Sequence, residues 1–425
     1  MWFPHYMQKN RQVNAFDLYR ITLRCSINSL YSNLCISQSM ASRSDTGGSV
    51  VIIGAGIVGA AAAYYFAEAG VDVTVIDAQT PAAGASGSSD GAVSVASKKP
   101  GPMMTVARTA RSLYGALEHE GILSGLFHTR PTFIFARTEE EREVLKLHGE
   151  DLMNTGEIVE HLSPEQMLSL IPGLSKQVTA GVAVPADGHA IGYQIVNRLL
   201  HLSDARVVRH APVERIRVQS GRAVGVETNA GFIGADTVLI AAGLGSAVLA
   251  GLGGALKPRK GQIIITDRAT DNVPALAGPL MSAAYLAAKR ASGNNSNTVS
   301  LVIDPLRTGQ FLIGGTREDG IGDKETTICH ISEILREAID VLPELRKRRV
   351  IRTFSGVRTA TADGLPIVGK HPSIDGLSIA TGFEGDGICL GPLMGQVAKD
   401  IVLNRTPSID IKPFSPKRFC HAIMD

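Results

Sequence analysis

Short runs of β-branched residues alternate with helix-forming segments from residue 49 of the chain onward. Residues 50–53 read Val-Val-Ile-Ile, which is typical of a strand buried on both faces, and residues 71–76 form a second run of this kind. The alanine-rich residues 60–68 between them favour a helix, which Gly70 ends. A strand, a helix and a second strand in this order predict a parallel βαβ unit, and hence an α/β fold class.

Two stretches of the chain carry no charge over lengths that raise the question of a membrane span, residues 49–67 and residues 237–256. A spanning helix needs about 20 predominantly apolar residues in succession. The second stretch contains five glycines, and both stretches change abruptly from a strand pattern to a turn pattern. We therefore predict buried α/β core at both places and no transmembrane segment.

The turn between the first predicted strand and the helix has the G-x-G-x-x-G spacing of a dinucleotide-binding motif. Gly54 suits the tight turn, Gly56 lets the backbone approach a pyrophosphate, and Gly59 allows close packing of helix on strand. Asp77 ends the second strand, where a carboxylate accepts hydrogen bonds from ribose hydroxyls. NAD and FAD both present an ADP half to such a motif, which therefore does not separate them. The residues predicted here to hold the nucleotide are Gly54, Ala55, Gly56, Ile57, Val58, Gly59, Asp77 and Ala78.

The composition excludes several other functions. The 425 residues include 42 Lys and Arg against 40 Asp and Glu, and a net charge of +2 is too balanced for nucleic acid as the main partner. Five scattered cysteines without a C-x-x-C pair argue against a disulfide framework and a zinc site, and we predict no metal. The four basic residues at 346–349 are more simply a solvated helix end than a nucleic-acid patch.

The first 48 residues differ from the rest, with five basic residues against two acidic ones and many Ser and Asn. They contain no apolar run of secretory-signal length, so export is not expected. Two interpretations stay open: a start codon assigned too early, with Met40 as a second candidate, or a basic organelle-targeting presequence over residues 1–39. In either case we place residues 1–48 outside the fold, and we expect a cytoplasmic protein or one peripheral to a membrane.

A loop of small and hydroxyl-bearing residues follows the second strand, at residues 81–91. With this loop the chain resembles the D-amino-acid oxidase-like family of FAD-dependent amine and amino-acid oxidoreductases, which has a similar G-A-S-x-x-N-A-G loop near the pyrophosphate and the flavin ring. Ser89-Asp90 stands where Asn-Ala is usual in that family. The resemblance implies non-covalent FAD as the cofactor, with contacts from Ser86, Ser88 and Ser89.

Three further strand candidates, residues 213–216, 223–228 and 237–243, are separated by turn signals. They resemble the β-meander and the returning strand that close an FAD domain in this family. Val213 then matches a residue whose backbone touches adenine, and its alternative is a plain core residue. Gly243 ends the returning strand, and we expect it to contact the cofactor.

The C-terminal part carries the most specific match. Residues 356–369 resemble the family pattern G-L-R-P-x-T-x-D-G-x-P-x-I-G, and a strand, a glycine-rich turn and a helix follow in residues 376–403. In the family this helix N-terminus faces the flavin pyrimidine, which implies cofactor contacts here for Gly385, Asp386, Gly387 and Ile388. Arg358 stands where amino-acid-specific members bind the substrate carboxylate, and its alternative is an ordinary structural ion pair.

The resemblance covers about residues 49–419 and implies two domains that are interleaved in the sequence. One is a Rossmann-type FAD-binding domain, and the other is a substrate domain built on an antiparallel sheet, so that the whole is α+β. The expected segments are residues 49–95, 160–250 and 350–419 for the FAD-binding domain, and residues 96–159 and 251–349 for the substrate-binding domain.

The reaction that the resemblance implies is oxidation of the C–N bond of an amino acid or secondary amine (D-amino acid, hydroxyproline, opine, glycine or sarcosine), with hydride transfer from Cα to flavin N5 and an imine as product. A covalent flavin is not predicted, because Gly356 and no cysteine precedes the motif of Asp363. The glycine-rich turn looks most like that of β-type subunits of opine, hydroxyproline and hydrogen-cyanide-forming dehydrogenases. This favours a dehydrogenase that passes electrons to partner subunits or a respiratory chain.

Three alternatives to that dehydrogenase stay open: a glycine- or sarcosine-type oxidase that makes hydrogen peroxide, a non-catalytic FAD-binding subunit, and an NAD-linked dehydrogenase.

Two residues whose side chains could take part in catalysis have simpler explanations. His189, in the turn at residues 185–189, is better explained by local hydrogen bonds than as a base. Cys389, in the glycine-rich turn, is more simply a small buried hydrophobic residue.

Overall fold

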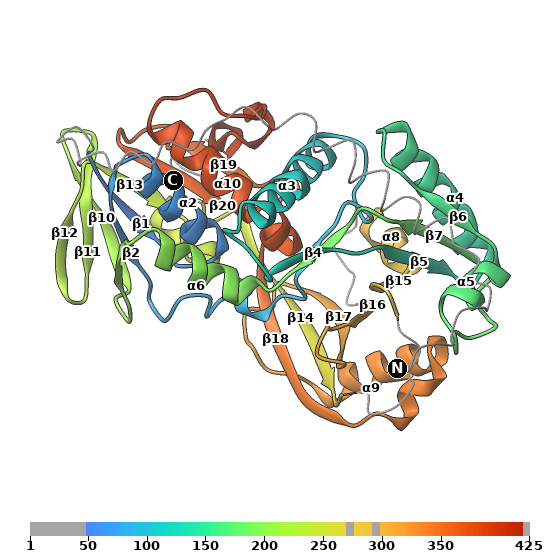
Figure 1. The fold of residues 1–425 in the computed structure, drawn as a ribbon. Helices are drawn as coiled ribbons and strands as arrows, with labels where there is room; N and C mark the ends of the chain where they lie inside the picture. Colours follow the sequence, from blue (N-terminus) through green and yellow to red (C-terminus); the bar gives the residue numbers. More distant parts are fainter. Residues whose placement is uncertain (1–47, 269–275, 291–297, 420–425) are drawn as a thin grey trace, which may run out of the picture. The chain divides into compact units, whose positions relative to one another are not determined.

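The computed structural model describes residues 48–268, 276–290 and 298–419. A six-stranded sheet contains the strand that carries the G-x-G-x-x-G turn, and its order is β19-β20-β13-β1-β2-β9 (Figure 1). All neighbours in this sheet are parallel except β19 and β20. The strands are β1 (Ser49–Ile53), β2 (Asp72–Ile76), β9 (Arg206–Val208), β13 (Thr237–Ile240), β19 (Ile367–Lys370) and β20 (Leu377–Thr381). The predicted α/β class and the first βαβ unit are confirmed.

Helices α2 (Ile57–Glu68) and α10 (Gly387–Val402) pack closely on one face of this sheet, and α6 (Gly192–Leu202) and α3 (Pro102–His119) pack beside them. Small residues make the close contact feasible. A Cβ atom on Gly395 would lie only 2.5 Å from Cβ of Ala61, and a Cβ atom on Gly391 would lie 2.6 Å from Cγ1 of Ile57. The alanine run of α2 is therefore a packing surface as well as a good helix former.

A β-meander covers the opposite face of the six-stranded sheet. It consists of β10 (Val213–Gln219), β11 (Arg222–Thr228) and β12 (Gly231–Gly234), paired antiparallel. Val226 of the meander joins Val51 and Val238 of the sheet in one buried cluster. The strands predicted at 213–216, 223–228 and 237–243 are thus present, the last of them as β13.

The second large sheet has eight strands in the order β18-β14-β17-β16-β15-β5-β7-β6, antiparallel except between β15 and β5. Phe133 and Phe135 of β5 face a core shared with α5 and α9, whereas Ile134 faces a core shared with α4 and α8. The elements are β5 (Thr132–Ala136), β6 (Glu160–Leu162), β7 (Ala180–Val184), β14 (Leu256–Thr266), β15 (Leu280–Ser282), β16 (Thr298–Pro305), β17 (Phe311–Asp319), β18 (Val350–Thr361), α4 (Glu139–Asn154), α5 (Pro164–Leu170), α8 (Ala283–Arg290) and α9 (Ile328–Val341).

Two segments that the sequence groups with the FAD-binding part contribute strands to this second sheet. Residues 160–184 supply β6 and β7, and residues 350–361 supply β18. The physical reason is that β7 pairs with β5, and β18 pairs along its whole length with β14. Strand pairing of this kind joins segments far apart in the chain and leaves no local signal. The division into two domains itself stays a prediction.

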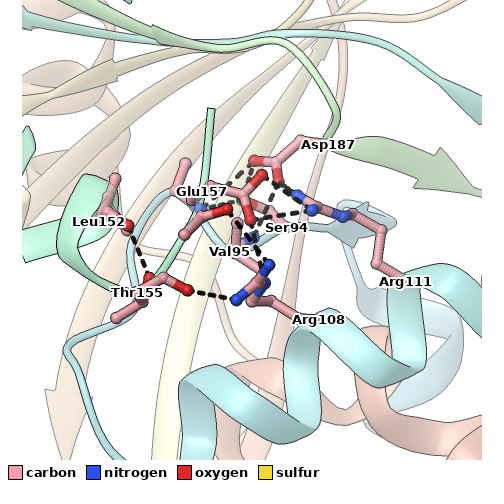
Figure 2. Close-up of polar contacts among 10 residues, drawn as sticks. Ser94, Val95, Arg108, Arg111, Leu152, Thr155, Glu157 and Asp187 are labelled. Carbon is pink, nitrogen blue, oxygen red and sulfur yellow. Dashed lines mark hydrogen bonds and ion pairs between the residues drawn. The ribbon is translucent and has the colours of Figure 1, made fainter. Parts of the chain in front are cut away.

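A buried ionic network connects α3 to the loop after the short strand β3 (Ala92–Val93), as Figure 2 shows. The Arg111 guanidinium donates to both carboxylate oxygens of Glu157, at 2.8 and 3.0 Å, and lies 3.2 Å from Asp187. Asp187 is fully buried and accepts hydrogen bonds from the hydroxyl of Ser94 and, at 2.9 Å, from the N–H of Val95. The network thereby holds the loop that leads to the functional site.

The third sheet is small and consists of β3, β8 (Gly188–Ala190) and β4 (Phe127–Thr129). Within residues 48–268, 276–290 and 298–419, no helix is both long enough and apolar enough to cross a membrane.

Candidate functional site

A cavity of about 650 Å³ lies at the carboxyl edge of the six-stranded sheet. Its lining includes residues that directly follow four parallel strands: Gly54 after β1, Asp77 after β2, Ala241 after β13 and Gly382 after β20. The carboxyl ends of parallel strands meet at one edge, where open α/β sheets bind their ligands. The volume is in the range of cofactor pockets.

The glycine turn brings the backbone close to this cavity. Gly54 has a φ of +105°, and a Cβ atom there would lie 2.4 Å from the carbonyl oxygen of Ala241. A Cβ atom on Gly59 would lie 2.0 Å from the carbonyl oxygen of Gly54. Both positions therefore require glycine for steric reasons, and Gly56 precedes the first turn of α2 as its N-cap. The N-terminus of α2 is presented to the cavity as the motif predicts.

The side chains of Asp77 and Ser86 accept hydrogen bonds from the backbone of this turn and of the start of α2. One oxygen of Asp77 accepts a hydrogen bond from the N–H of Ala55 at 2.8 Å, and the other accepts from the N–H of Gln79 at 2.7 Å. A carboxylate has about four acceptor sites, so two stay available for ligand hydroxyls. The hydroxyl of Ser86 accepts from the N–H of Ile57 at 3.0 Å, at the start of α2.

Two smaller hollows adjoin the large cavity and share lining residues with it or with each other. The first, of about 140 Å³, shares Ser86, Glu384 and Gly387 with the large cavity. The second, of about 120 Å³, shares Asp90, Ile263, Tyr285, Arg358 and Gly385 with the first. The shared residues place the three spaces next to one another, from the parallel sheet to the eight-stranded sheet.

The predicted cofactor residues distribute over these spaces as follows. The large cavity is lined by Gly54, Gly56, Ile57, Val58, Asp77, Ala78, Ser86, Val213, Gly243 and Gly387. The first hollow is lined by Ser88, Ser89, Gly385 and Ile388 together with Arg358, and the second by Gly385, Asp386 and Arg358. Ala55 and Gly59 line none of the three; they act through the hydrogen bond to Asp77 and through close packing.

Arg358 on β18 belongs to a cluster of arginines around one carboxylate. Glu384 lies 3.1 Å from Arg317, 3.3 Å from Arg259 and 3.8 Å from Arg358. Arg259 also pairs with Asp319, so three guanidinium groups face two carboxylates and the cluster carries a net charge of +1. The side chain of Arg358 is 27% exposed and is the most weakly paired of the three. The structural ion pair considered for Arg358 is therefore present, and the cluster still favours an anion.

A buried ion pair with no signal in the local sequence joins Lys98 to Asp386. The Lys98 amine is 2.5 Å from the carboxylate, and both residues line the second hollow. Burial by itself would lower the pKa of Lys98, but the facing Asp386 carboxylate raises this pKa above its ordinary value. The carboxylate of Asp386, which was predicted to contact the cofactor, is thus engaged by Lys98 at the start of α10.

His189 and Cys389 have the environments of structural residues. Burial, with a contribution from Arg130, lowers the pKa of His189 to about 3, and the residue lines none of the three spaces. Burial raises the pKa of Cys389 to about 12, which keeps its thiol protonated. The interpretation of Cys389 as a small buried hydrophobic residue is confirmed by its 2% exposure. Residues 346–349 are largely exposed at the end of a short 3₁₀ helix.

The cavity fits a dinucleotide on the grounds just given: a turn that admits no Cβ atom, a helix N-terminus and a carboxylate with free acceptor sites. Among the described residues, no group of three or more His, Cys, Asp or Glu is arranged to hold a metal ion.

Comparison with known proteins agrees with this chemistry. The sequence profile of the DAO family, FAD dependent oxidoreductases, matches residues 49–401. The chain is 29% identical to a glycine oxidase of Geobacillus kaustophilus over 383 residues, which is 87% of this chain and 96% of that protein. The crystal structure of glycine oxidase from G. kaustophilus has a TM-score of 0.77 and 26% identity, covering 87% of this chain and 98% of that one. An iminodiacetate oxidase from Chelativorans sp. BNC1 has a TM-score of 0.75 and 25% identity, covering 86% and 98%.

Proposed function

The chain belongs to the DAO family of FAD-dependent oxidoreductases, and from this premise we propose that it oxidises the C–N bond of a small amino acid or secondary amine. Its relatives support this class of reaction, since they include glycine oxidases and an iminodiacetate oxidase. The observation that carries the proposal is the place of Arg358. This arginine lines both small hollows, beside the residues predicted to contact the flavin.

The residues of the large cavity would hold the adenosine and pyrophosphate parts of FAD. The α2 N-terminus would face the phosphates, and Asp77 would accept hydrogen bonds from the ribose. Ser88, Ser89 and Gly385 line the first hollow, where the ring end of the cofactor would follow. When bound, FAD supplies the two-electron acceptor for the reaction.

The contribution of the chain to catalysis is orientation and exclusion of water. Arg358 would hold the substrate carboxylate with its guanidinium fork, helped by the net positive charge of the arginine cluster. Apolar side chains that line the second hollow, among them Ile263, Met281 and Leu312, would surround the reacting carbon. Fixing a neutral amine in one orientation is worth several kcal/mol of barrier without an acid or base from the protein.

The test is anaerobic bleaching of the flavin absorption by a panel of D-, L- and N-alkyl amino acids. We expect the purified protein to be yellow and at least one amino acid to bleach it. A yellow protein that no member of the panel bleaches would support the non-catalytic FAD-binding subunit instead. A colourless protein that reduces NAD with an amino acid would support the NAD-linked alternative.

The electron acceptor distinguishes two forms of this function. The glycine-rich turn favours a dehydrogenase that transfers electrons to a partner subunit or a respiratory chain, whereas the relatives named above favour an oxidase. Reduced protein mixed with air decides between them. Reoxidation within one turnover time, with an equal amount of hydrogen peroxide, identifies the oxidase; slow reoxidation, with fast transfer to an artificial dye, identifies the dehydrogenase.

A further inference from the structure

The loop between β17 and α9, residues 320–327, reaches from the eight-stranded sheet to the large cavity. Gly322 and Lys324 of this loop are among the residues that line the cavity. The Lys324 amine donates a hydrogen bond to the carbonyl oxygen of Ala83 at 3.0 Å. Ala83 belongs to the loop of small residues after β2 and lines the same cavity. Two loops from different sheets therefore meet at the wall of the large cavity.

The residues on both sides of Lys324 are held by strand β14. The Asp323 carboxylate lies 2.9 Å from the amine of Lys260, which is buried. The N–H of Thr327 donates to the side-chain oxygen of Gln262 at 2.8 Å, and Gln262 is fully buried. Buried side chains of β14 thus fix the loop before and after Lys324, which gives this residue a defined place beside the cavity.

Lys324 is the only cationic side chain among the described residues that line the large cavity. The acidic side chains of the same lining are Asp77, Glu214 and Glu384. Glu384 is paired with the arginine cluster, and Asp77 accepts hydrogen bonds from backbone N–H groups. An anionic group that enters this cavity therefore finds one side chain of opposite charge, the Lys324 ammonium.

The contact with Ala83 also places the Lys324 amine relative to the glycine turn. The N–H of Ala82 donates to the carbonyl oxygen of Ala55, within that turn, at 3.0 Å. Ala82 and Ala83 thus adjoin the part of the motif that approaches a pyrophosphate. Among the described residues the Lys324 amine donates only to Ala83. An ammonium group has three N–H donors, so two stay available for a ligand.

We propose that Lys324 binds the pyrophosphate of FAD through these two donors. The glycine turn then supplies backbone N–H groups to the phosphates, and the loop from the eight-stranded sheet supplies their counter-charge. Lys324 belongs to none of the motifs by which the sequence indicates a cofactor site. The inference goes beyond the proposed function, because it depends on FAD as the cofactor and on no particular substrate.

The first experiment measures the dissociation constant of FAD by dilution of the loaded protein and the fluorescence of the released flavin. The variants are Lys324→Arg, Lys324→Met and Lys324→Glu. We expect Lys324→Arg to bind FAD within about threefold of the parent protein and Lys324→Met to bind it about tenfold more weakly. Lys324→Glu should be weaker still by about tenfold, because repulsion replaces the lost attraction.

The matched control is Lys347→Met, which removes the same charge from an exposed lysine that lines none of the three spaces. It should leave the dissociation constant of FAD unchanged. If Lys324→Met binds FAD as tightly as the parent protein, the inference is overturned. Equal losses in all three Lys324 variants also overturn it, because Lys324 then contributes packing and not charge.

Competition experiments identify the part of the cofactor that Lys324 contacts. ADP contains the pyrophosphate and adenosine does not, and each is tested for displacement of FAD from the loaded protein. We expect Lys324→Met to weaken ADP about tenfold and adenosine by no more than about twofold. Equal weakening of the two compounds overturns the inference, because Lys324 then serves the adenosine site or the fold.

None of these measurements requires turnover, so the inference and the proposed function are tested separately. The expected order of the Lys324 variants supports the inference even where no amino acid bleaches the flavin. Unchanged FAD binding in Lys324→Met and Lys324→Glu overturns it even where amino acids bleach the flavin rapidly.

Discussion

The large cavity at the parallel sheet and the second hollow at the eight-stranded sheet are built in different ways. The cavity depends on backbone: Gly54 and Gly59 have no room for a Cβ atom, because the carbonyl oxygens of Ala241 and Gly54 lie where one would stand. The hollow depends on side chains from several distant segments, among them Lys98, Asp304 and Arg358. A cofactor that many proteins of one fold bind requires the same backbone geometry in each of them. The substrate, in contrast, is selected by side chains that can differ while the fold stays the same.

The largest effect is expected from Gly54→Val, which distorts the glycine turn that lines the large cavity. Its Cβ atom would overlap the carbonyl oxygen of Ala241 and its φ of +105° disfavours any side chain. We expect the protein to lose FAD binding by 100-fold or more, measured by fluorescence titration of the apoprotein, and to melt earlier. Gly115→Ala is the control, since it lies in α3 with nothing within 4 Å of its Cβ position. It is expected to be stabilised by about 0.5–1 kcal/mol with FAD affinity unchanged.

The next largest effect is expected from Lys98→Met, which removes the ion pair with Asp386 at the start of α10. It leaves the Asp386 carboxylate without its cation in a site where Lys98 is 4% exposed. Removal of one member of a buried pair costs about 3–5 kcal/mol, which chemical denaturation would measure. The double variant Lys98→Met with Asp386→Asn should recover part of the loss. If the single variant is as stable as the parent protein, the pair does not hold α10 in place.

Arg358→Ala tests the part of the second hollow that is lined by Arg317 and Arg358. It should weaken transition-state binding by about 2 kcal/mol. Loss of the half-buried guanidinium partner of the substrate carboxylate lowers kcat/KM by ~30-fold or more, while FAD stays bound. The exposed Arg142→Ala is the control, because it pairs only with Glu139 on the surface of α4. Unchanged kcat/KM with normal flavin content would remove Arg358 from the substrate site and leave its role as the ion pair with Glu384.

The effect that is smallest for a single step, here one pH unit, is the pH dependence that Asp304 adds to stability. Its pKa is raised from 3.8 to about 7 in the folded protein, so between these values the folded state holds a proton that the unfolded state has lost. Stability therefore falls as pH rises through this range, by at most ~1.4 kcal/mol per pH unit, and levels off above pH 7. Asp304→Asn lacks this contribution. Unfolding free energies of the two proteins from pH 5 to 8 should differ by an amount that changes with pH, and parallel curves would contradict the raised pKa.

Prediction from sequence succeeded where neighbours in the chain are also neighbours in space. Gly54, Gly56 and Asp77 could be placed because one strand, one turn and one helix bring them together. The polar residues of β16 in the second hollow had a weak local signal, because Ser300 and Asp304 alternate with Leu301 and Ile303 in a strand-like run. That pattern indicates two polar residues on one face of a strand, but it does not tell whether the face is solvent or a cavity.

The sequence by itself predicted the fold class and the glycine turn for a dinucleotide, because short-range sterics and hydrophobic period specify a βαβ unit within about 30 residues. Arg358 became a candidate only through the resemblance of its segment to a family pattern. Only the tertiary structure decided that β6, β7 and β18 belong to the second sheet, and that Lys98 pairs with Asp386. It also placed Glu384 among three arginines and paired the buried Asp304 with Arg130 at the second hollow. These features are contacts between groups tens to hundreds of residues apart. Burial sets their strength, and burial exists only once the sheets and helices have packed.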